Sequence, residues 1–262
     1  MTPSFPLVAG AVSVQLPVQR TWGPAQALLM TPGGDWHLRT LPTGESVEWR
    51  MKFTGLTAAE AQTLKQFHQD VRGSYHCFRF CDPLRNLLAW SEDPTQGPWT
   101  RSGALSITLA PGSGAEAFQT AQILNLSGTE ALVSQAVGCS PNFTYSMSVR
   151  AQSNSQSTIG LLIGGQRKNV TLSEQWQTYQ FTAEPGGSMD QVSFAIAMPM
   201  GGAVGLGGVH AEFGACSPEY RKSEGMQGLF ANARFNDDPL VVSCEKGGIF
   251  STEATVVAKV GE

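Results

Sequence analysis

Apolar and charged positions alternate strictly along residues 47–53, where four apolar side chains are separated by three charged ones. A period of two is typical of a strand that buries one face. The aromatic-rich residues 75–80 predict a second strand. Between the two, apolar residues recur every three or four positions, which predicts one amphipathic helix over residues 57–72. Thr57 and Glu60 stand at capping-box spacing, so each side chain can satisfy an amide of the first helical turn.

The residues before position 47 carry shorter patterns, which predict strands and turns and no helix. Residues 11–16 alternate between apolar and polar side chains, and residues 27–30 and 36–39 are further candidate strands. Proline, glycine and aspartate at positions 32–35 predict a turn between the last two. We expect a small N-terminal sandwich on which the helix docks.

From residue 86 to residue 214 the chain consists of short strand-like segments spaced by Gly, Ser, Pro and Asn, with few Lys or Arg. The predicted strands are residues 105–109, 122–126, 145–151, 159–163, 176–182 and 192–198. The glycine-rich residues 201–208 have no GKS or GKT ending and no helix after them, so they predict a flexible or tightly turning connection rather than a phosphate site. Regular short strands without a helix favour a jelly roll.

Two further strands, residues 240–244 and 252–260, flank a Lys-Gly-Gly turn and predict a hairpin. An isolated hairpin is only marginally stable, so we predict that residues 215–262 return to complete the N-terminal sheet. The predicted fold is therefore mainly β, with two β-sandwich domains. The first, residues 1–85, carries the docked helix, and the second, residues 86–214, is a jelly roll inserted into it.

Composition agrees with short strands joined by turns, because 15% of the residues are charged while the chain holds 29 Gly and 15 Pro. The net charge of −4 offers no basic field for a phosphate backbone, which excludes nucleic acid as an electrostatic partner. No apolar run reaches the length of a membrane span and no signal-peptide layout opens the chain, so we expect folding in a cytoplasm. Five cysteines, an odd number, indicate free thiols.

Candidate catalytic and metal-binding groups are scattered along the chain. The four histidines show no metal-ligand spacing, and Cys77 and Cys81 lack a second cysteine pair, so structural roles are favoured for all of them. Two of the carboxylates Glu92, Asp93, Glu212, Asp237 and Asp238 could form an acid/base pair for sugar hydrolysis, but solvated surface positions are favoured. No G-x-S-x-G motif occurs. We predict no catalytic residue, no metal, no cofactor and no enzyme activity.

Three tryptophans in the jelly-roll segment, Trp90, Trp99 and Trp176, are candidate glycan contacts. An exposed indole can stack on the apolar C–H face of a sugar ring. Packing in the core is the commoner role of a tryptophan, so both roles remain open for each of the three.

The residues around the predicted helix carry a family resemblance. They are Trp49 and Phe53 at the end of the first strand, Arg72-Gly73 after the helix, and the run Phe78-Arg79-Phe80-Cys81-Asp82-Pro83. With these residues the segment resembles the N-terminal domain of bacteriophage distal tail proteins. In that family an arginine-glycine pair precedes an aromatic strand that ends in an aspartate.

The jelly-roll segment carries a second resemblance. Its marks are Asn86-Leu87-Leu88 with Trp99 shortly after, Tyr145–Val149 in the middle, Trp176–Tyr179 near the end and Gly208–Gly214 at the close. These residues resemble the jelly-roll modules of the carbohydrate-binding type that occur in glycoside hydrolases and phage tail proteins.

The two resemblances imply a structural virion protein with a part in host attachment. The N-terminal domains would form a homo-oligomeric ring, a hexamer in the distal tail family, that joins the tail tube protein to the baseplate hub protein at the tail tip. The jelly roll would dock a tail fibre or receptor-binding protein, or touch a host surface glycan. Such a protein is assembled in the host cytoplasm and ends in the virion. The alternatives are a stand-alone carbohydrate-binding module protein and a glycan hydrolase whose site the sequence does not reveal.

Overall fold

The computed structural model describes residues 2–6, 8, 14–30, 36–111, 118–155, 157–187, 190–214, 219–245 and 247–260, with the backbone alone for residues 25–30 and 36–44. The described chain is mainly β with a single α-helix, in agreement with the predicted fold class, and its strands form three antiparallel sheets. It divides into two compact units. Unit 1 comprises residues 1–80 and 230–262, and unit 2 comprises residues 81–229.

The sequence patterns predict that the inserted domain begins after residue 85 and ends at residue 214. In the structure unit 2 begins earlier, after residue 80, and ends later, at residue 229. Asp82 donates its amide to the carbonyl of Gly228 at 2.8 Å, and the side chain of Asn86 donates to the carbonyl of Arg221 at 3.2 Å. Both ends of the inserted segment therefore pack with the jelly roll.

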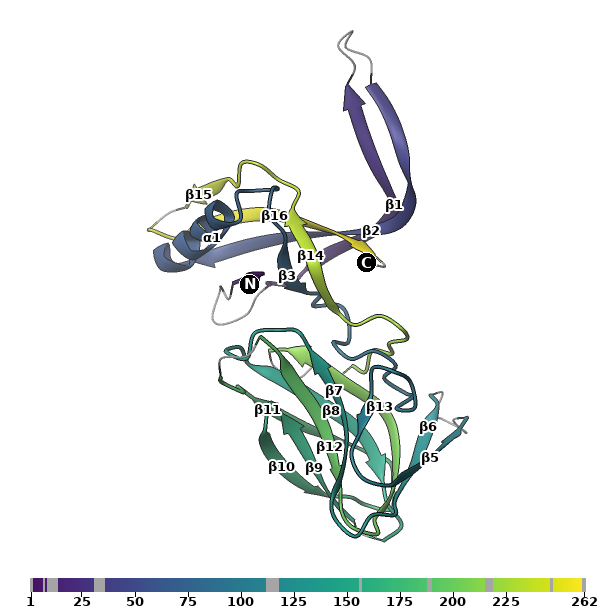
Figure 1. Ribbon diagram of the computed structural model, residues 1–262. Coiled ribbons are helices and arrows are strands. Elements are labelled where there is room, and N and C mark those ends of the chain that lie inside the picture. The colour runs from purple at the N-terminus through teal and green to yellow at the C-terminus, as the bar shows by residue number, and fades with distance from the viewer. Residues whose placement is uncertain are drawn as a thin grey trace. The chain divides into compact units, whose positions relative to one another are not determined.

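Unit 1 is built on one sheet with the strand order β1-β2-β16-β14-β3, and β15 pairs beside β16 (Figure 1). Its elements are β1 (Val18–Met30), β2 (Trp36–Leu56), α1 (Ala58–Asp70), β3 (Phe78–Cys81), β14 (Leu229–Phe235), β15 (Val242–Cys244) and β16 (Phe250–Val260). β16 pairs antiparallel with β2 between Glu45 and Leu56. The C-terminal strands thus belong to the same sheet as the N-terminal ones.

The alternating residues of β2 divide between the two faces of this sheet. Trp49 and Phe53 are fully buried, as their period of two predicts. α1 covers the buried face, and its capping box is formed. The amide of Glu60 donates to Thr57 Oγ1 at 3.3 Å, and the amide of Thr57 donates to Glu60 Oε2 at 2.8 Å. The predicted helix is confirmed, with Thr57 as its cap.

An aromatic cluster fills the core of unit 1, and Phe5 is at its centre. The Phe5 ring lies 5.5 Å from that of Phe80 and 5.7 Å from that of Phe67. Backbone bonds hold the segment in place, because the Phe5 amide donates to the Arg79 carbonyl at 2.9 Å and the Arg79 amide donates to Pro3 at 2.8 Å. The N-terminal segment therefore covers the β3 edge of the sheet.

The strand predicted over residues 11–16 is wrong in its described part, because residues 14–16 lie outside any strand. The side chain of Gln15, and not its backbone, pairs with β2. Its amide donates to the carbonyl of Thr54 at 3.0 Å and accepts from the Thr54 amide at 2.8 Å. The predicted strands over residues 27–30 and 36–39 lie in β1 and β2, and the turn predicted over residues 32–35 lies outside the described residues.

Beyond the sheet, β1 and β2 continue as a two-stranded ribbon. Five pairs, from Gln26↔Thr40 to Met30↔Trp36, extend past the part of β2 that pairs with β16. Figure 1 shows this hairpin rising away from the rest of unit 1. Within the described residues its strands pair only with each other. We call residues 26–30 and 36–40 the arm.

Unit 2 is a sandwich of two five-stranded antiparallel sheets, which confirms the predicted jelly roll. The sheet orders are β10-β9-β12-β7-β4 and β11-β8-β13-β6-β5. The strands are β4 (Thr100–Arg101), β5 (Leu105–Ala110), β6 (Thr120–Asn125), β7 (Ala131–Val137), β8 (Tyr145–Gln152), β9 (Thr158–Ile163), β10 (Gln166–Thr171), β11 (Gln177–Ala183), β12 (Val192–Met198) and β13 (Ala203–Phe213). A single apolar core fills the space between the sheets.

Candidate functional site

The sheet β11-β8-β13-β6-β5 has an apolar inner face and a polar outer face. Along β8, Met147 and Val149 are fully buried in the core, while Arg150 and Gln152 alternate with them and face away from it. β13 lies beside β8, and its register shifts between Gly207 and Val209. We call the side of this sheet that faces away from the core the outer face.

Three glycines of β13 form the floor of the outer face. A side chain at Gly205 would begin 3.1 Å from Trp176 Cη2, and one at Gly208 would begin 2.9 Å from Tyr220 Cε2. At Gly207 a Cβ atom would overlap the ring of Phe118. Gly208 also has a φ of +68°, in the left-handed region that favours glycine. The missing side chains leave the space that the three rings occupy.

This arrangement corrects one sequence-based expectation. The glycines at 201–208 suggest a flexible connection, yet most of them lie in β13, a central strand of the sheet. Glycine in a strand interior marks a close approach of another group. Here that group is an aromatic ring.

Trp176, Phe118 and Tyr220 form a continuous row, which we call the aromatic row. The ring centroids of Phe118 and Trp176 are 6.4 Å apart at an interplanar angle of 87°, and those of Phe118 and Tyr220 are 6.3 Å apart at 62°. All three rings are partly exposed, and Tyr220 is 37% exposed. Rings packed edge to face in this way hold one another in fixed orientations.

Polar side chains border the row. Gln122 on β6 and Gln152 on β8 both approach Gly205, the position beneath Trp176. The guanidinium of Arg150 lies 5.3 Å from the centroid of the Phe118 ring. The face therefore combines aromatic surface with amide and guanidinium groups.

Two carboxylates fasten the segment that carries Tyr220. Glu92 Oε2 lies 3.1 Å from Lys222 Nζ, and Glu92 Oε1 accepts a hydrogen bond from the Tyr220 hydroxyl at 3.2 Å. Glu212 Oε2 lies 3.5 Å from Arg221 Nη1. The expectation that Glu92 and Glu212 are solvated is wrong, since both are buried. Burial of these two carboxylates is tolerated because each forms an ion pair, Glu92 with Lys222 and Glu212 with Arg221.

His210 lies beneath this segment on the outer face of β13. It is 1% exposed, and its Nε2 atom has no hydrogen-bond partner among the described residues. Its ring stands nearly perpendicular to that of Tyr220, at 87° and 6.3 Å between centroids. Burial, with a smaller contribution from the charge of Arg221, lowers the pKa of His210 from 6.5 to about 4. The imidazole is therefore neutral at neutral pH.

The three tryptophans named as candidate glycan contacts have different positions. Trp176 belongs to the aromatic row. Trp99 is 4% exposed, and its indole nitrogen donates to the carbonyls of Ala89 and Trp90 at 3.1 and 3.0 Å, so it packs in the core and offers no face to a ligand. Trp90 is half-buried and packs against the core of unit 2 and near Gly225.

Sequence reasoning missed Phe118 and Tyr220 as members of the row. Neither stands in a motif, and they come from segments about a hundred residues apart in the chain. The glycines of β13 could have indicated these residues, because glycine in a strand interior marks the close approach of another group to the backbone.

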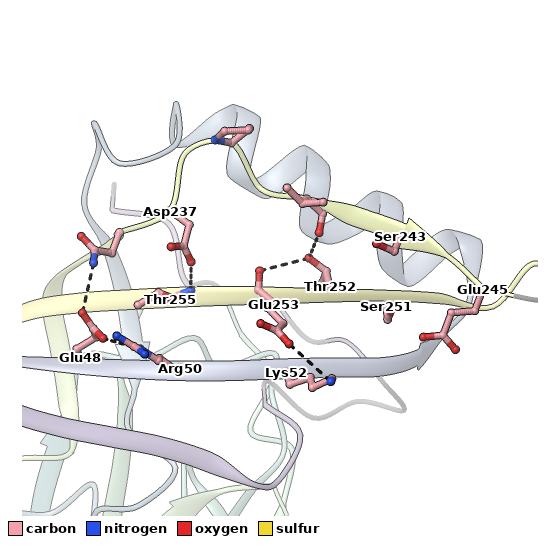
Figure 2. Close-up of a pocket in the computed structure, with 13 residues that line it drawn as sticks. Glu48, Arg50, Lys52, Asp237, Ser243, Glu245, Ser251, Thr252, Glu253 and Thr255 are labelled. Atoms are coloured by element: carbon pink, nitrogen blue, oxygen red, sulfur yellow. Dashed lines mark hydrogen bonds and ion pairs between the residues drawn. The ribbon is translucent and has the colours of Figure 1, made fainter.

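Unit 1 contains a separate polar groove of about 700 Å³ on its sheet, shown in Figure 2. Its charged side chains pair along β2 and between β2 and β16. Arg50 Nε lies 2.9 Å from Glu48 Oε1, and Lys52 Nζ lies 3.6 Å from Glu253 Oε1. Asp237 Oδ2 accepts from the amide of Thr255 at 2.6 Å. These contacts make the described part of the groove a strand surface crossed by ion pairs.

Among the described residues, no group of three or more His, Cys, Asp or Glu side chains is placed to hold a metal ion. Cys77, Cys81, Cys139 and Cys244 are free thiols. No helix in the described part of the chain has the length and apolarity to span a membrane.

No known protein family model matches the chain, and neither does any curated protein. Solved structures match about half of it at low identity. The family 22 carbohydrate-binding module of Clostridium thermocellum Xyn10B is 14% identical, and the match covers 53% of this chain and 100% of the module with a TM-score of 0.41. The CBM22-1 xylan-binding domain of Paenibacillus barcinonensis Xyn10C is 12% identical over 53% of this chain and 100% of that domain, with a TM-score of 0.40.

The enzymatically active domain of the bacteriophage CBA120 tailspike protein 4 is 15% identical to this chain. That match covers 50% of this chain but 22% of the tailspike chain, with a TM-score of 0.38. Likenesses at these TM-scores assign no function. The fold and the outer face themselves define unit 2 as a jelly-roll module with an aromatic, polar-bordered surface.

Proposed function

We propose that the protein binds carbohydrate on the outer face of unit 2. The observation that carries the proposal is the aromatic row, which lies over a glycine floor on an otherwise polar sheet face. Sugar rings present apolar C–H faces that pack against aromatic rings, and binding surfaces for small ligands combine such rings with a few placed polar groups. The rings are partly exposed and held by their neighbours, so little ordering is needed on binding.

The amides beside Trp176 support the same function. Each glutamine side chain, Gln122 and Gln152, carries both donors and an acceptor. Sugar hydroxyls also donate and accept, so these amides match a carbohydrate better than they match a purely apolar or purely charged ligand. Gln122 Nε2 and the side chain of Gln152 both lie at the Gly205 position beside Trp176, so a sugar ring stacked on Trp176 would lie next to these two side chains.

Replacing the stacking ring tests this proposal. The Trp176→Ala variant of the full chain is expected to lose glycan affinity by at least about tenfold, which corresponds to about 1.4 kcal/mol. Affinity electrophoresis against a panel of soluble polysaccharides, followed by calorimetry on those that bind, measures this loss. Trp22→Ala is the matched control, because Trp22 is a partly exposed tryptophan of unit 1. Unchanged affinity in Trp176→Ala, or no binding by the folded parent chain to any polysaccharide, contradicts the proposal.

A second candidate function is that of a structural virion protein of the distal tail type, a ring-forming adaptor between tail tube and baseplate hub. The arm favours it, because a two-stranded ribbon is only marginally stable alone and needs a partner surface. The register sets Leu28 opposite Leu38 and Met30 opposite Trp36, so apolar positions pair along the ribbon. The occupant that we propose for the arm is a second copy of this chain.

Mass photometry across a dilution series tests the adaptor function. The full chain is expected to form a discrete closed oligomer, and a variant with residues 27–38 replaced by a short Gly-Ser turn is expected to remain a monomer. A monomeric full chain at micromolar concentration contradicts this second function and leaves the carbohydrate-binding function standing.

A further inference from the structure

We propose that the outer face selects glycans that carry acetamido sugars. Leu124 and Ala203, which lie beside the aromatic row, contact the methyl group of the acetamido substituent, and Gln122 forms a hydrogen bond with its amide part. This inference rests on the proposed carbohydrate-binding function, and it adds the class of sugar that the face takes.

The first argument is the position of Leu124 and Ala203 in the sheet. In the pairing of β6 with β13, Gln122 lies opposite Gly205. The next pair on the same face is Leu124 opposite Ala203, about 7 Å further along the strands. Trp176 and Gln122 both approach Gly205. A sugar ring stacked on Trp176 would therefore lie next to the Leu124–Ala203 pair.

The second argument is that this pair is already open to solvent. Leu124 is 40% exposed, and Ala203 and Gln122 are exposed as well. On its other side Leu124 pairs with Ser106 of β5, which is also exposed. Leu124 thus stands between two small side chains on neighbouring strands, with part of its own apolar surface uncovered.

The third argument is the chemistry of the pair. Leu124 and Ala203 are apolar, whereas Gln122 and Ser106 beside them are polar. A sugar hydroxyl placed over the two apolar side chains would give up water without gaining a hydrogen bond from them. A methyl group in the same place gains free energy by leaving water. The substituent that suits this position is therefore apolar at its tip.

The fourth argument is the side chain of Gln122. It is exposed and forms no hydrogen bond within the described residues. Its amide offers two N–H donors and a carbonyl acceptor. An acetamido group carries a carbonyl and an N–H next to its methyl group, so it matches a glutamine and a leucine that follow each other on one strand face. A sugar methyl group without the amide matches Leu124 alone, and a free amino group matches Gln122 alone.

The backbone beneath the pair is held by hydrogen bonds in the absence of a ligand. Ser153 Oγ donates to the Ala203 carbonyl at 2.8 Å. The Asn125 amide donates to the Gly202 carbonyl at 3.0 Å. These bonds fix the start of β13 against β6 and β8, so the contact surface is formed before binding and little ordering is needed.

The ligand side of the test uses the unaltered full chain. Chitohexaose, cellohexaose and the hexamer of glucosamine share one backbone linkage and differ at C2, where they carry an acetamido group, a hydroxyl and an amino group. In calorimetry we expect chitohexaose to bind at least about tenfold more tightly than either of the others, since it adds one methyl contact and one hydrogen bond. Equal affinities, or a preference for cellohexaose or for the glucosamine hexamer, overturn the inference.

The protein side of the test changes Leu124. The Leu124→Gln variant keeps a side chain of similar length at an exposed strand position and removes the apolar contact. We expect it to bind chitohexaose about fourfold more weakly and cellohexaose within about twofold of the parent. Leu16→Gln, at an exposed leucine of unit 1, is the matched control and is expected to change neither affinity. An undiminished preference for chitohexaose in Leu124→Gln overturns the role of Leu124.

The outcomes separate this inference from the function on which it rests. If Trp176→Ala abolishes binding while glycans with and without acetamido groups bind alike, the outer face binds carbohydrate and the inference alone fails. The inference also fails alone if the chain binds only polysaccharides that lack acetamido groups. If the folded chain binds no glycan of either class, both the function and the inference fail. A chitohexaose preference that Trp176→Ala leaves unchanged places the acetamido site elsewhere and overturns both.

Discussion

At Gly207 any other side chain would occupy the space that the ring of Phe118 fills. The same dependence holds at Gly205 and Gly208, where a Cβ atom would stand 3.1 Å from Trp176 and 2.9 Å from Tyr220. Cβ atoms do not approach aromatic carbons so closely without a shift of one partner. The position of each ring in the aromatic row therefore depends on a residue that has no side chain.

We expect Gly207→Ala to displace Phe118 and to reduce glycan affinity by about tenfold, since the centre of the row is lost while every ring remains present. Calorimetry with a polysaccharide that binds the parent chain measures the effect. Gly128→Ala is the control, because Gly128 is exposed and a Cβ atom there meets nothing within 4 Å. Equal affinity in the two variants would contradict the role of the glycine floor.

His210 predicts a pH dependence of stability. Its folded-state pKa of about 4 lies below the ordinary 6.5, so the unfolded chain takes up the proton first. The free energy of unfolding of unit 2 is therefore expected to fall as pH decreases from about 6.5 to about 4, by on the order of 3 kcal/mol. Urea titrations at a series of pH values measure this slope.

In the same titrations the His210→Phe variant is expected to lose this part of the slope. His76→Gln, which changes an exposed histidine, is expected to keep it. An unaltered slope in His210→Phe would assign the pH dependence to other groups.

At the scale of elements, α1 depends on its capping box. Removing the hydroxyl in Thr57→Ala leaves a first-turn amide without its acceptor, which costs about 1 kcal/mol in the free energy of unfolding of unit 1. Chemical denaturation followed by circular dichroism checks this value. Thr63→Ala, at an exposed position inside the same helix, is expected to be neutral or slightly stabilising because alanine favours helices. Glycan affinity should be unchanged in both variants.

Local patterns were sufficient where neighbours in sequence decide the structure. The alternation of residues 47–53, the capping box and most strands of unit 2 are of this kind. They were insufficient for β13, because glycine carries no hydrophobic pattern to show which face is buried. They also failed for Glu92, which is buried because Lys222, far along the chain, brings the compensating charge.

The candidate site was accessible to sequence reasoning only in part. Trp176 stood out as a tryptophan between polar residues, but the same criterion also selected Trp99, which packs in the core. The difference between them is made by partners distant in sequence: Trp99 donates to the carbonyls of Ala89 and Trp90, while Trp176 meets Phe118. Residue type alone does not encode those contacts.

At the scale of the whole molecule, unit 2 is inserted between β3 and β14, which are neighbours in one sheet. Neighbouring strands are about 5 Å apart, and the bond between Asp82 and Gly228 keeps the two crossing segments together. We therefore expect a chain in which residues 82–228 are replaced by a short Gly-Ser linker to fold as unit 1 alone. A single cooperative transition by circular dichroism and fluorescence would show this, and an aggregated or unstructured product would contradict it.

The position of β16 between β2 and β14 has a consequence for biogenesis. During translation β2 emerges early, but β16 leaves the ribosome only after the whole of unit 2. Unit 2 has all its strands in one continuous stretch and can complete itself first, because none of its strands has to wait for β16. Until β16 arrives, the nascent unit 1 displays a bare strand edge beside its aromatic residues, and it is this interval in which a chaperone would be needed.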